Sequence, residues 1–414
     1  MLDRVLRLWD RLPDLPAQIG ADRFTVMEMT AEACLNAGEL DAGIAAATAA
    51  LLITRAALHD RDGQDPLPDL LEATHLLPPA SASVVRGRVL AEPATSQRNH
   101  RRLAPARASA EEALEIGRRT HDRVVQAKAL VTLAALAAAN ADLATAIELY
   151  GEAGAAAAQA GAHDTQLLVA ITESDTLEAA GEHARAAQVA RQGMALAADL
   201  GLARTRGTLL APNLSESLLS LGRRPEATEV DRAALSLAPP PLYQAYLQII
   251  QATVDLRRGD TGPASAAAEQ ARAAMRGNNR GEESCLEPDL LDCRLAQVTQ
   301  DAGAVAAIIG HVLDDHDLLV SPRYGWPLLY TAAQSLNDHR QGEGLIQRLV
   351  DWSGKLTVTG RLQRAYQLSN RQIGEQLYIS AKTAGVHVSN ILAKLGVTTR
   401  LEAAAWAHRT RLFG

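Results

Sequence analysis

The residues best suited to chemistry lie near the end of the chain, on one side of an expected helix. They are Lys382, Gly385, Val386, Ser389 and Asn390, which fall together when the segment is unrolled at about 100° per residue. Serine and asparagine can donate to and accept from base edges, valine can pack on a thymine methyl group, and lysine can reach a phosphate or a guanine. This set of side chains therefore suits contact with DNA in the major groove.

Two short helices joined by a tight apolar turn are expected to position this face. Ser380 is a candidate N-cap for a helix that runs to Leu395, and Gly396 follows as the left-handed residue that ends it. Ser369 and Gln372 have capping-box spacing at the start of a preceding helix. The opposite face of the second helix is apolar and expected to be buried: Ala384, Val388, Ile391, Leu392 and Leu395. The spacing predicts a helix-turn-helix whose second helix enters the major groove.

Further residues of this stretch stand at fixed offsets: Ser369-Asn370, Ile373-Gly374, Leu377, Ser380, Thr383-Ala384, His387, Ile391 and Lys394-Leu395. This pattern closely resembles the LuxR-type DNA-binding domain of bacterial transcription regulators. The resemblance implies a four-helix domain in which Gly385, Val386 and Ser389 face the bases. It also implies that a last helix, Arg400–His408, pairs two domains, so that a homodimer binds inverted half-sites in promoter DNA. In this interpretation Asn390 also reads bases, and phosphates are held by Asn370, Arg371, Lys382, Thr383 and Lys394.

The start of this domain departs from the family pattern. The family opens with Leu-Thr-x-Arg-Glu, a full helix and a glycine just before the Ser/Thr-Asn pair. Leu356-Thr357 is present here, but residues 358–368 run about three residues short and lack both the acidic residue and the glycine at that position. The alternative interpretation is a helical-repeat scaffold for protein interactions whose tail does not bind DNA. Binding of the purified chain to promoter fragments distinguishes the two.

The remaining sequence is helical in composition and acidic. Alanine is abundant, aromatic residues make up 3%, and alternating Val/Ile/Thr runs are scarce, which predicts an all-α chain. Residues 355–414 contain nine Lys/Arg and two Asp/Glu, a balance of +7, and the whole chain is −7, so residues 1–354 carry −14. Because lysine and arginine supply most non-specific affinity for DNA, we expect the basic end to bind DNA and the acidic body to repel it.

Turn-forming residues recur through the body at a nearly constant interval. They are Asn140, Gly181, Gly222, Gly259 and Asp301, which are 41, 41, 37 and 42 residues apart. A period of about forty residues with two helices per unit is typical of an α-solenoid of tetratricopeptide type, and a chance series of alanine-rich helices is the alternative. The sequence therefore predicts a tetratricopeptide-like body over 1–350, with a polar loop at Asn278–Pro288, and a DNA-binding domain over 355–414.

The body also resembles, more loosely, the C-terminal helical half of the large ATP-binding LuxR-type regulators, through the stretches Asn213–Arg223 and Asp199–Leu202. Their ATPase domain is not expected here, because the phosphate-binding pattern G-x-x-x-x-G-K-[ST] does not occur. We therefore expect no nucleotide cofactor.

Catalysis and metal binding are not expected either. Cys34, Cys285 and Cys293 lack paired spacing, which favours buried or free thiols in a reducing compartment. The basic cluster Arg98–Arg102 is a solvated loop or a second anion site. No signal peptide or bilayer-length apolar run occurs, which predicts a cytoplasmic protein without a membrane partner. The sequence as a whole indicates a DNA-binding transcription regulator, not an enzyme, whose helical body receives a ligand or protein signal.

Overall fold

The computed structural model describes residues 40–61, 65–77, 86–92, 103–140, 142–275, 283–316, 318 and 322–336, together with residues 345, 348, 349, 351, 389 and 392. These residues are helical apart from short turns, and no strand occurs among them, which confirms the all-α prediction. None of the described helices is both long and apolar enough to cross a membrane. Backbone contacts group the chain into two units, with a boundary between Glu173 and Ser174. That boundary falls inside the expected body, and the division into 1–350 and 355–414 stays a prediction.

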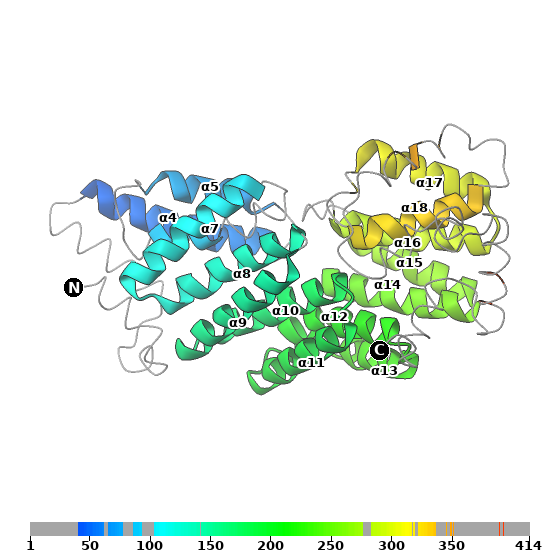
Figure 1. Cartoon of the computed structure of the whole chain (residues 1–414), viewed down its shortest axis with the longest axis horizontal. Helices are drawn as coiled ribbons and strands as arrows, with labels where there is room; N and C mark the ends of the chain where they lie inside the picture. The colour runs from blue at the N-terminus through cyan, green and yellow to red at the C-terminus, as the bar shows by residue number, and fades with distance from the viewer. Residues whose placement is uncertain are drawn as a thin grey trace, which may run out of the picture. The chain divides into compact units, whose positions relative to one another are not determined.

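The first unit consists of packed helices that pair with their neighbours in the chain. They are α4 (Leu40–Arg61), α5 (Leu67–His75), the helical segment 86–92, α7 (Leu103–Thr120), α8 (Arg123–Ala139), α9 (Leu143–Gln159) and the first part of α10 (His163–Ala179). α4 packs on α5, and α8 packs on both α7 and α9 (Figure 1). Alanines with no exposed surface, including Ala113, Ala134 and Ala153, lie in the shared core, so the helix axes can approach closely.

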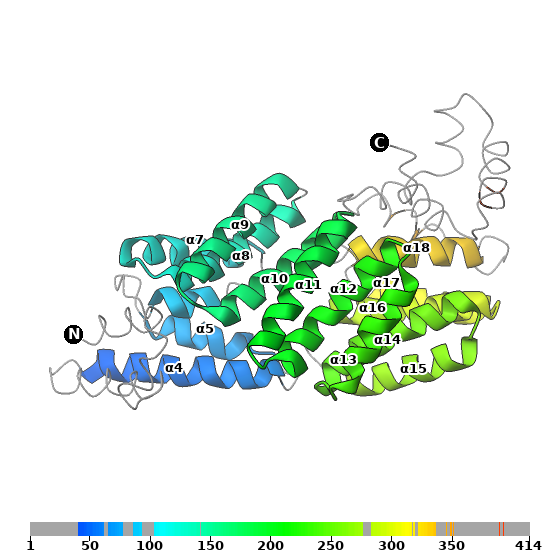
Figure 2. The ribbon, with the colours of Figure 1, turned by 90° about the horizontal axis from the view of Figure 1, so that it is seen from below.

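The second unit continues the alternation of helices from the end of α10 onward. It contains α11 (His183–Asp199), the π-helical turn η1 (Ala203–Gly207), α12 (Thr208–Ser220), α13 (Arg224–Ser236), α14 (Pro241–Arg258), α15 (Thr261–Met275), α16 (Glu283–Val298), α17 (Ala302–Asp315) and α18 (Pro322–Leu336). Each helix from α11 to α18 packs on the next, and α12, α14, α16 and α18 also contact one another in turn (Figure 2). These four helices therefore form one layer, and α13, α15 and α17 pack against it. This is the arrangement of stacked helical hairpins, as the repeat predicted.

The five predicted turn residues lie where one helix ends and the next begins. Gly181, Gly222 and Gly259 have φ values of 85°, 73° and 88°, in the left-handed region that favours glycine. Asp301 is the N-cap of α17, and its carboxylate accepts a hydrogen bond from the backbone N–H of Ala304 at 2.9 Å. The interval near forty residues is thus the length of one helical hairpin. The tetratricopeptide-like assignment itself stays a prediction.

The polar loop predicted at Asn278–Pro288 is partly wrong. α16 begins at Glu283 and contains Pro288. Pro288 is the sixth residue of this helix, so it lacks the N–H that would bond to the carbonyl of Ser284, and its ring crowds that carbonyl. Leu286, Leu290 and Cys293, which are buried in one core with α17 and α18, stabilise this first part of α16.

Two glycines of opposite backbone geometry give a matched stability prediction. Gly259 ends α14 at φ 88°, whereas Gly310 lies inside α17, and a Cβ atom added at either position would meet nothing within 4 Å. The backbone conformation alone therefore determines whether a Gly→Ala substitution stabilises or destabilises the unit. Gly259→Ala should destabilise the unit by about 1 kcal/mol, and Gly310→Ala should stabilise it by about 1 kcal/mol. Urea titrations followed by circular dichroism measure both, and shifts of the same sign would contradict the assigned turn.

Candidate functional site

Most residues predicted to contact DNA lie outside the described part of the chain. These are Asn370, Arg371, Lys382, Thr383, Gly385, Val386, Asn390 and Lys394. Ser389 is described: it lies in a helix and is exposed. Leu392, which was expected on the opposite, buried face, is helical and half-buried. The roles of all nine DNA-contacting residues stay predictions.

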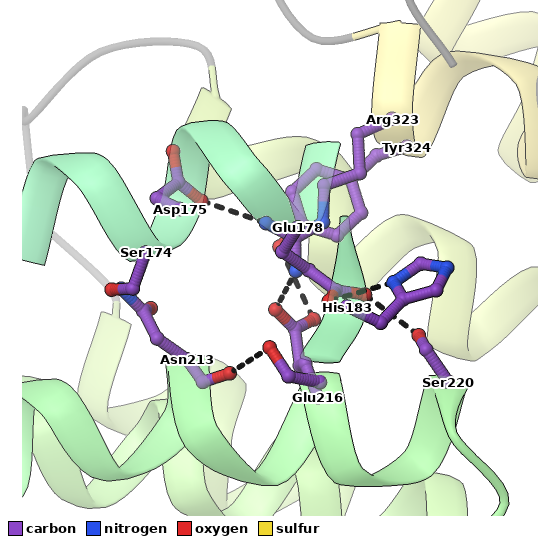
Figure 3. Close-up of polar contacts among 10 residues, drawn as sticks. Ser174, Asp175, Glu178, His183, Asn213, Glu216, Ser220, Arg323 and Tyr324 are labelled. Carbon is purple, nitrogen blue, oxygen red and sulfur yellow. Dashed lines mark hydrogen bonds and ion pairs between the residues drawn. The ribbon is translucent and has the colours of Figure 1, made fainter. Parts of the chain in front are cut away.

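A second candidate site, which the sequence did not reveal, is a group of polar side chains inside the second unit (Figure 3). We call it the Arg323 cluster, and it consists of Ser174, Asp175, Glu178, His183, Asn213, Glu216, Ser220, Arg323 and Tyr324. The members come from the end of α10, the first residue of α11, the middle and end of α12, and the first turn of α18. Three carboxylates therefore lie close to one guanidinium group.

Arg323 is the centre of the cluster, and 16% of its side chain is exposed. Its Nη1 donates to Oδ1 of Asp175 at 2.7 Å, and its Nη2 donates to Oε2 of Glu216. The guanidinium carbon also lies 5.4 Å from the centre of the Tyr324 ring. Since Asp175 and Glu216 precede Arg323 by 148 and 107 residues, the arginine joins α18 to two helices that are distant in the sequence.

Glu178 is a deeply buried carboxylate whose two oxygens both have partners. Oε2 lies 2.8 Å from Nδ1 of His183, and Oε1 accepts a hydrogen bond from the Ser220 hydroxyl at 2.6 Å. Burial alone would raise the pKa of Glu178, but the hydrogen bond and charge of His183, with help from Arg323, lower this pKa to about 2. Glu178 is therefore ionised at neutral pH.

Glu216 is held less completely than Glu178. Besides its ion pair with Arg323, Glu216 has the Tyr324 hydroxyl at 3.4 Å from its Oε1. An ordinary O–H···O hydrogen bond is about 2.5–3.0 Å long, so this oxygen has a weak partner. Burial raises the pKa of Glu216, and the charges of Glu178 and Asp175 act in the same direction, whereas Arg323 opposes them. The pKa of Glu216 is thereby raised to about 7, and its carboxylate, when ionised, has the least compensated charge of the cluster.

A further buried carboxyl group, that of Asp231 on α13, lies against α12. Its residue is 3% exposed, its Oδ1 accepts a hydrogen bond from the Ser215 hydroxyl at 2.6 Å, and its Oδ2 has no partner. Burial raises the pKa of Asp231 to about 7, and the charge of Glu216 adds to the shift, although Ser215 lowers it. This carboxyl group is therefore protonated in a large fraction of molecules at neutral pH.

Six members of the Arg323 cluster line a cavity of about 150 Å³. The polar lining residues are Glu178, His183, Glu216, Ser220, Thr253, Arg257, Glu287, Arg294, Arg323 and Tyr324. The large apolar ones are Leu219, Ile249, Ile250, Leu290, Leu291 and Pro327. All of them belong to the second unit. The layer of α12, α14, α16 and α18 supplies most of the walls, so the stacking of the hairpins forms the cavity.

The chemistry of this cavity is that of charges and hydrogen bonds. Among the described residues, no group of three or more His, Cys, Asp or Glu could hold a metal ion. Cys293 is buried, as expected for the cysteines, and burial raises the pKa of its thiol to about 12, which makes it a poor nucleophile. Cys34 and the side chain of Cys285 lie outside the described residues. The polar residues on its lining can form ion pairs and hydrogen bonds.

Comparison with known proteins concerns the other candidate site. Residues 363–407 match the family described as bacterial regulatory proteins, luxR family, and this range includes all nine residues predicted to contact DNA. A stretch of 44 residues is 50% identical to the Transcriptional regulatory protein LiaR of Bacillus subtilis (strain 168). The match covers 11% of this chain and spans only 21% of that relative's length. The segment 363–407 of this chain therefore belongs to the luxR family of bacterial regulatory proteins.

Proposed function

We propose that the chain is a transcription regulator that binds promoter DNA through residues 363–407. The observation that carries the proposal is the luxR-family match, which spans the expected helix Ser380–Leu395. The balance of +7 over residues 355–414 supports it, because neutralisation of phosphates supplies much of the affinity for DNA. In this proposal Gly385, Val386, Ser389 and Asn390 face the bases, while the phosphates are held by Asn370, Arg371, Lys382, Thr383 and Lys394.

The finer parts of the proposal concern assembly and signal. Two copies bind inverted half-sites whose centres lie about one helical turn apart, as two-fold helix-turn-helix proteins require. The helical body receives a ligand or a protein that changes the affinity for DNA. The cavity in the second unit supports a ligand, since charged groups from five helices line it.

Titration of the full chain with promoter DNA tests the proposal, and two variants separate positioning from base reading. Lys382→Ala should weaken binding to every sequence alike and reduce the slope of log affinity against log salt by about one, because it removes one phosphate contact. Val386→Ala should cost about 1 kcal/mol at the preferred site and little elsewhere, because it removes apolar contact with a base. Fluorescence anisotropy with preferred and scrambled duplexes at several salt concentrations measures both.

Arg191→Ala is the control, since Arg191 is an exposed arginine of the acidic body. It should leave affinity and salt slope unchanged. If the wild-type chain showed no preference for any fragment upstream of its own or neighbouring genes, the proposal would fail. In that case the interaction scaffold would be favoured, as the short segment 358–368 suggests.

A further inference from the structure

The cavity of the second unit contains both an undercompensated negative charge and an unpaired positive charge. On the Arg323 cluster side, the carboxylates of Asp175, Glu178 and Glu216 share one arginine and one histidine. When Glu216 is ionised, that group carries two surplus negative charges if His183 is neutral and one if His183 is protonated. Glu216 is the member that lines the cavity with a weakly bonded oxygen. A cationic group of a ligand would complete its coordination.

Arg294 supplies the opposite charge. It lies on α16, is half-buried and lines the same cavity. In the described part of the chain it makes no hydrogen bond or ion pair, whereas Arg257 and Glu287 on the lining both have partners. An arginine is charged at every physiological pH, and its planar group matches a carboxylate in a bidentate manner. Arg294 is thus suited to an anionic group of the same ligand.

The volume of the cavity and its apolar walls limit the part of the ligand that connects its cationic and anionic groups. A cavity of about 150 Å³ is about half the lower bound for drug-sized ligands, and an engineered cavity of that volume admits benzene, so about ten heavy atoms or fewer fit. Leu219, Ile249 and Leu290 are aliphatic walls that favour a short hydrocarbon group over a sugar or a nucleotide.

We propose that this cavity binds a small aliphatic amino acid, with the ammonium group on Glu216, the carboxylate on Arg294 and the side chain against Leu219, Ile249 and Leu290. A simple anion would leave Glu216 uncompensated and would meet the surplus carboxylates. A simple amine would leave Arg294 without a partner. A zwitterion satisfies both groups at once, and a charged group that is partly withdrawn from water gains from a partner of opposite charge.

Isothermal titration calorimetry on the full chain without DNA tests the site. The probes are L-valine, L-leucine, L-isoleucine and L-methionine. The tightest of them is then compared with two analogues: the acid that lacks its amino group and the amine that lacks its carboxylate. At least one of the four amino acids should bind, and each analogue should bind at least about tenfold more weakly, because it leaves either Glu216 or Arg294 unmatched.

Two variants should give a crossed pattern. Arg294→Met should lower the affinity for the amino acid at least about tenfold. It should leave the affinity for the amine analogue unchanged, because the amine has no carboxylate to contact the arginine. Glu216→Gln should lower the affinity for the amino acid by a similar factor, and it should leave the affinity for the acid analogue unchanged or raise it. Arg191→Met and Glu229→Gln, two exposed positions outside the cavity, are the matched controls and should bind like wild type. Circular dichroism melting shows whether each variant is folded.

The proposal is overturned if none of the four amino acids binds at about 10 mM, a concentration at which a millimolar site would be mostly occupied. It is also overturned if an analogue binds as tightly as its amino acid, or if both variants bind like wild type. The role of this ligand as the signal that controls DNA binding rests on the proposed function. The calorimetry itself is carried out without DNA. A chain that fails to bind promoter fragments would therefore leave this result unaffected.

Discussion

Arg323→Met should lower the free energy of unfolding of the second unit by about 3–5 kcal/mol, which is the usual loss when one partner of a buried ion pair is removed. The variant keeps an apolar side chain of similar reach but leaves the carboxylate of Glu216 buried without its cation. The bond to Asp175 contributes little to this loss, because half of that side chain, 51%, is exposed to water. Urea titration followed by circular dichroism measures the change.

A double variant and a control show whether charge is the cause. Arg323→Met combined with Glu216→Gln should recover most of the loss, because an uncharged amide no longer needs a cation. The single variant's loss should shrink as the pH falls from about 8 to about 5, because burial raises the pKa of Glu216 and protonation then removes the unpaired charge. Arg232→Met breaks an exposed pair with Glu229 and should leave the free energy of unfolding nearly unchanged. Equal losses for the two arginines would rule out this account.

Asp231→Asn should stabilise the protein at alkaline pH by several kcal/mol. The pKa of Asp231 is raised from 3.8 to about 7 by burial, so the ionised form is disfavoured in the folded state. A shift of this size corresponds to roughly 4 kcal/mol when the group is fully ionised. Asparagine has the same shape and stays neutral, and its amide can still form a hydrogen bond with Ser215, the present partner of Asp231.

The sign of the pH dependence follows from the raised pKa. Below pH 3.8 the carboxyl group is protonated in both states and costs nothing, and between about pH 4 and pH 7 the wild-type protein loses stability as the unfolded state ionises first. The advantage of Asp231→Asn should therefore be absent at pH 4 and complete by about pH 8. Asp199→Asn, at an exposed position, should change stability by less than about 0.5 kcal/mol at either pH. A pH-independent advantage of Asp231→Asn would refute the assigned burial cost.

The helical hairpins could be predicted because their signals are local. Gly222 and Gly259 mark turns at which a left-handed residue is required, and such a requirement depends only on a few neighbouring residues. Ala238 also has a positive φ, of 49°, but alanine does not signal a turn, so the sequence did not predict the end of α13. The sequence pattern wrongly placed Pro288 in a loop. Proline disfavours a helix locally, but the packing of α16 against α17 and α18 outweighs this local preference.

The Arg323 cluster could not be predicted because its contacts are long-range. Arg323 and Glu216 are each ordinary charged residues in an acidic chain, and 107 residues separate them. Their burial depends on how many hairpins lie between α12 and α18 and on how these hairpins stack. The sequence patterns of α12 and α18 contain no information about the number of hairpins between them. By contrast, the nine predicted DNA-contacting residues occupy one short stretch, where fixed offsets on a helix are enough to recognise the luxR-family segment.

The long connection between Asp175 and Arg323 also has a consequence for synthesis of the chain. A ribosome that adds roughly 5–20 residues per second incorporates Arg323 about 7–30 s after Asp175, since 148 residues separate them. During that interval the nascent hairpins from α10 to α17 present their carboxylates without the arginine. Those side chains remain without this cation until α18 leaves the ribosome and docks on α10 and α12. Nascent chains arrested before Pro322 should therefore be the form most exposed to proteases and chaperones.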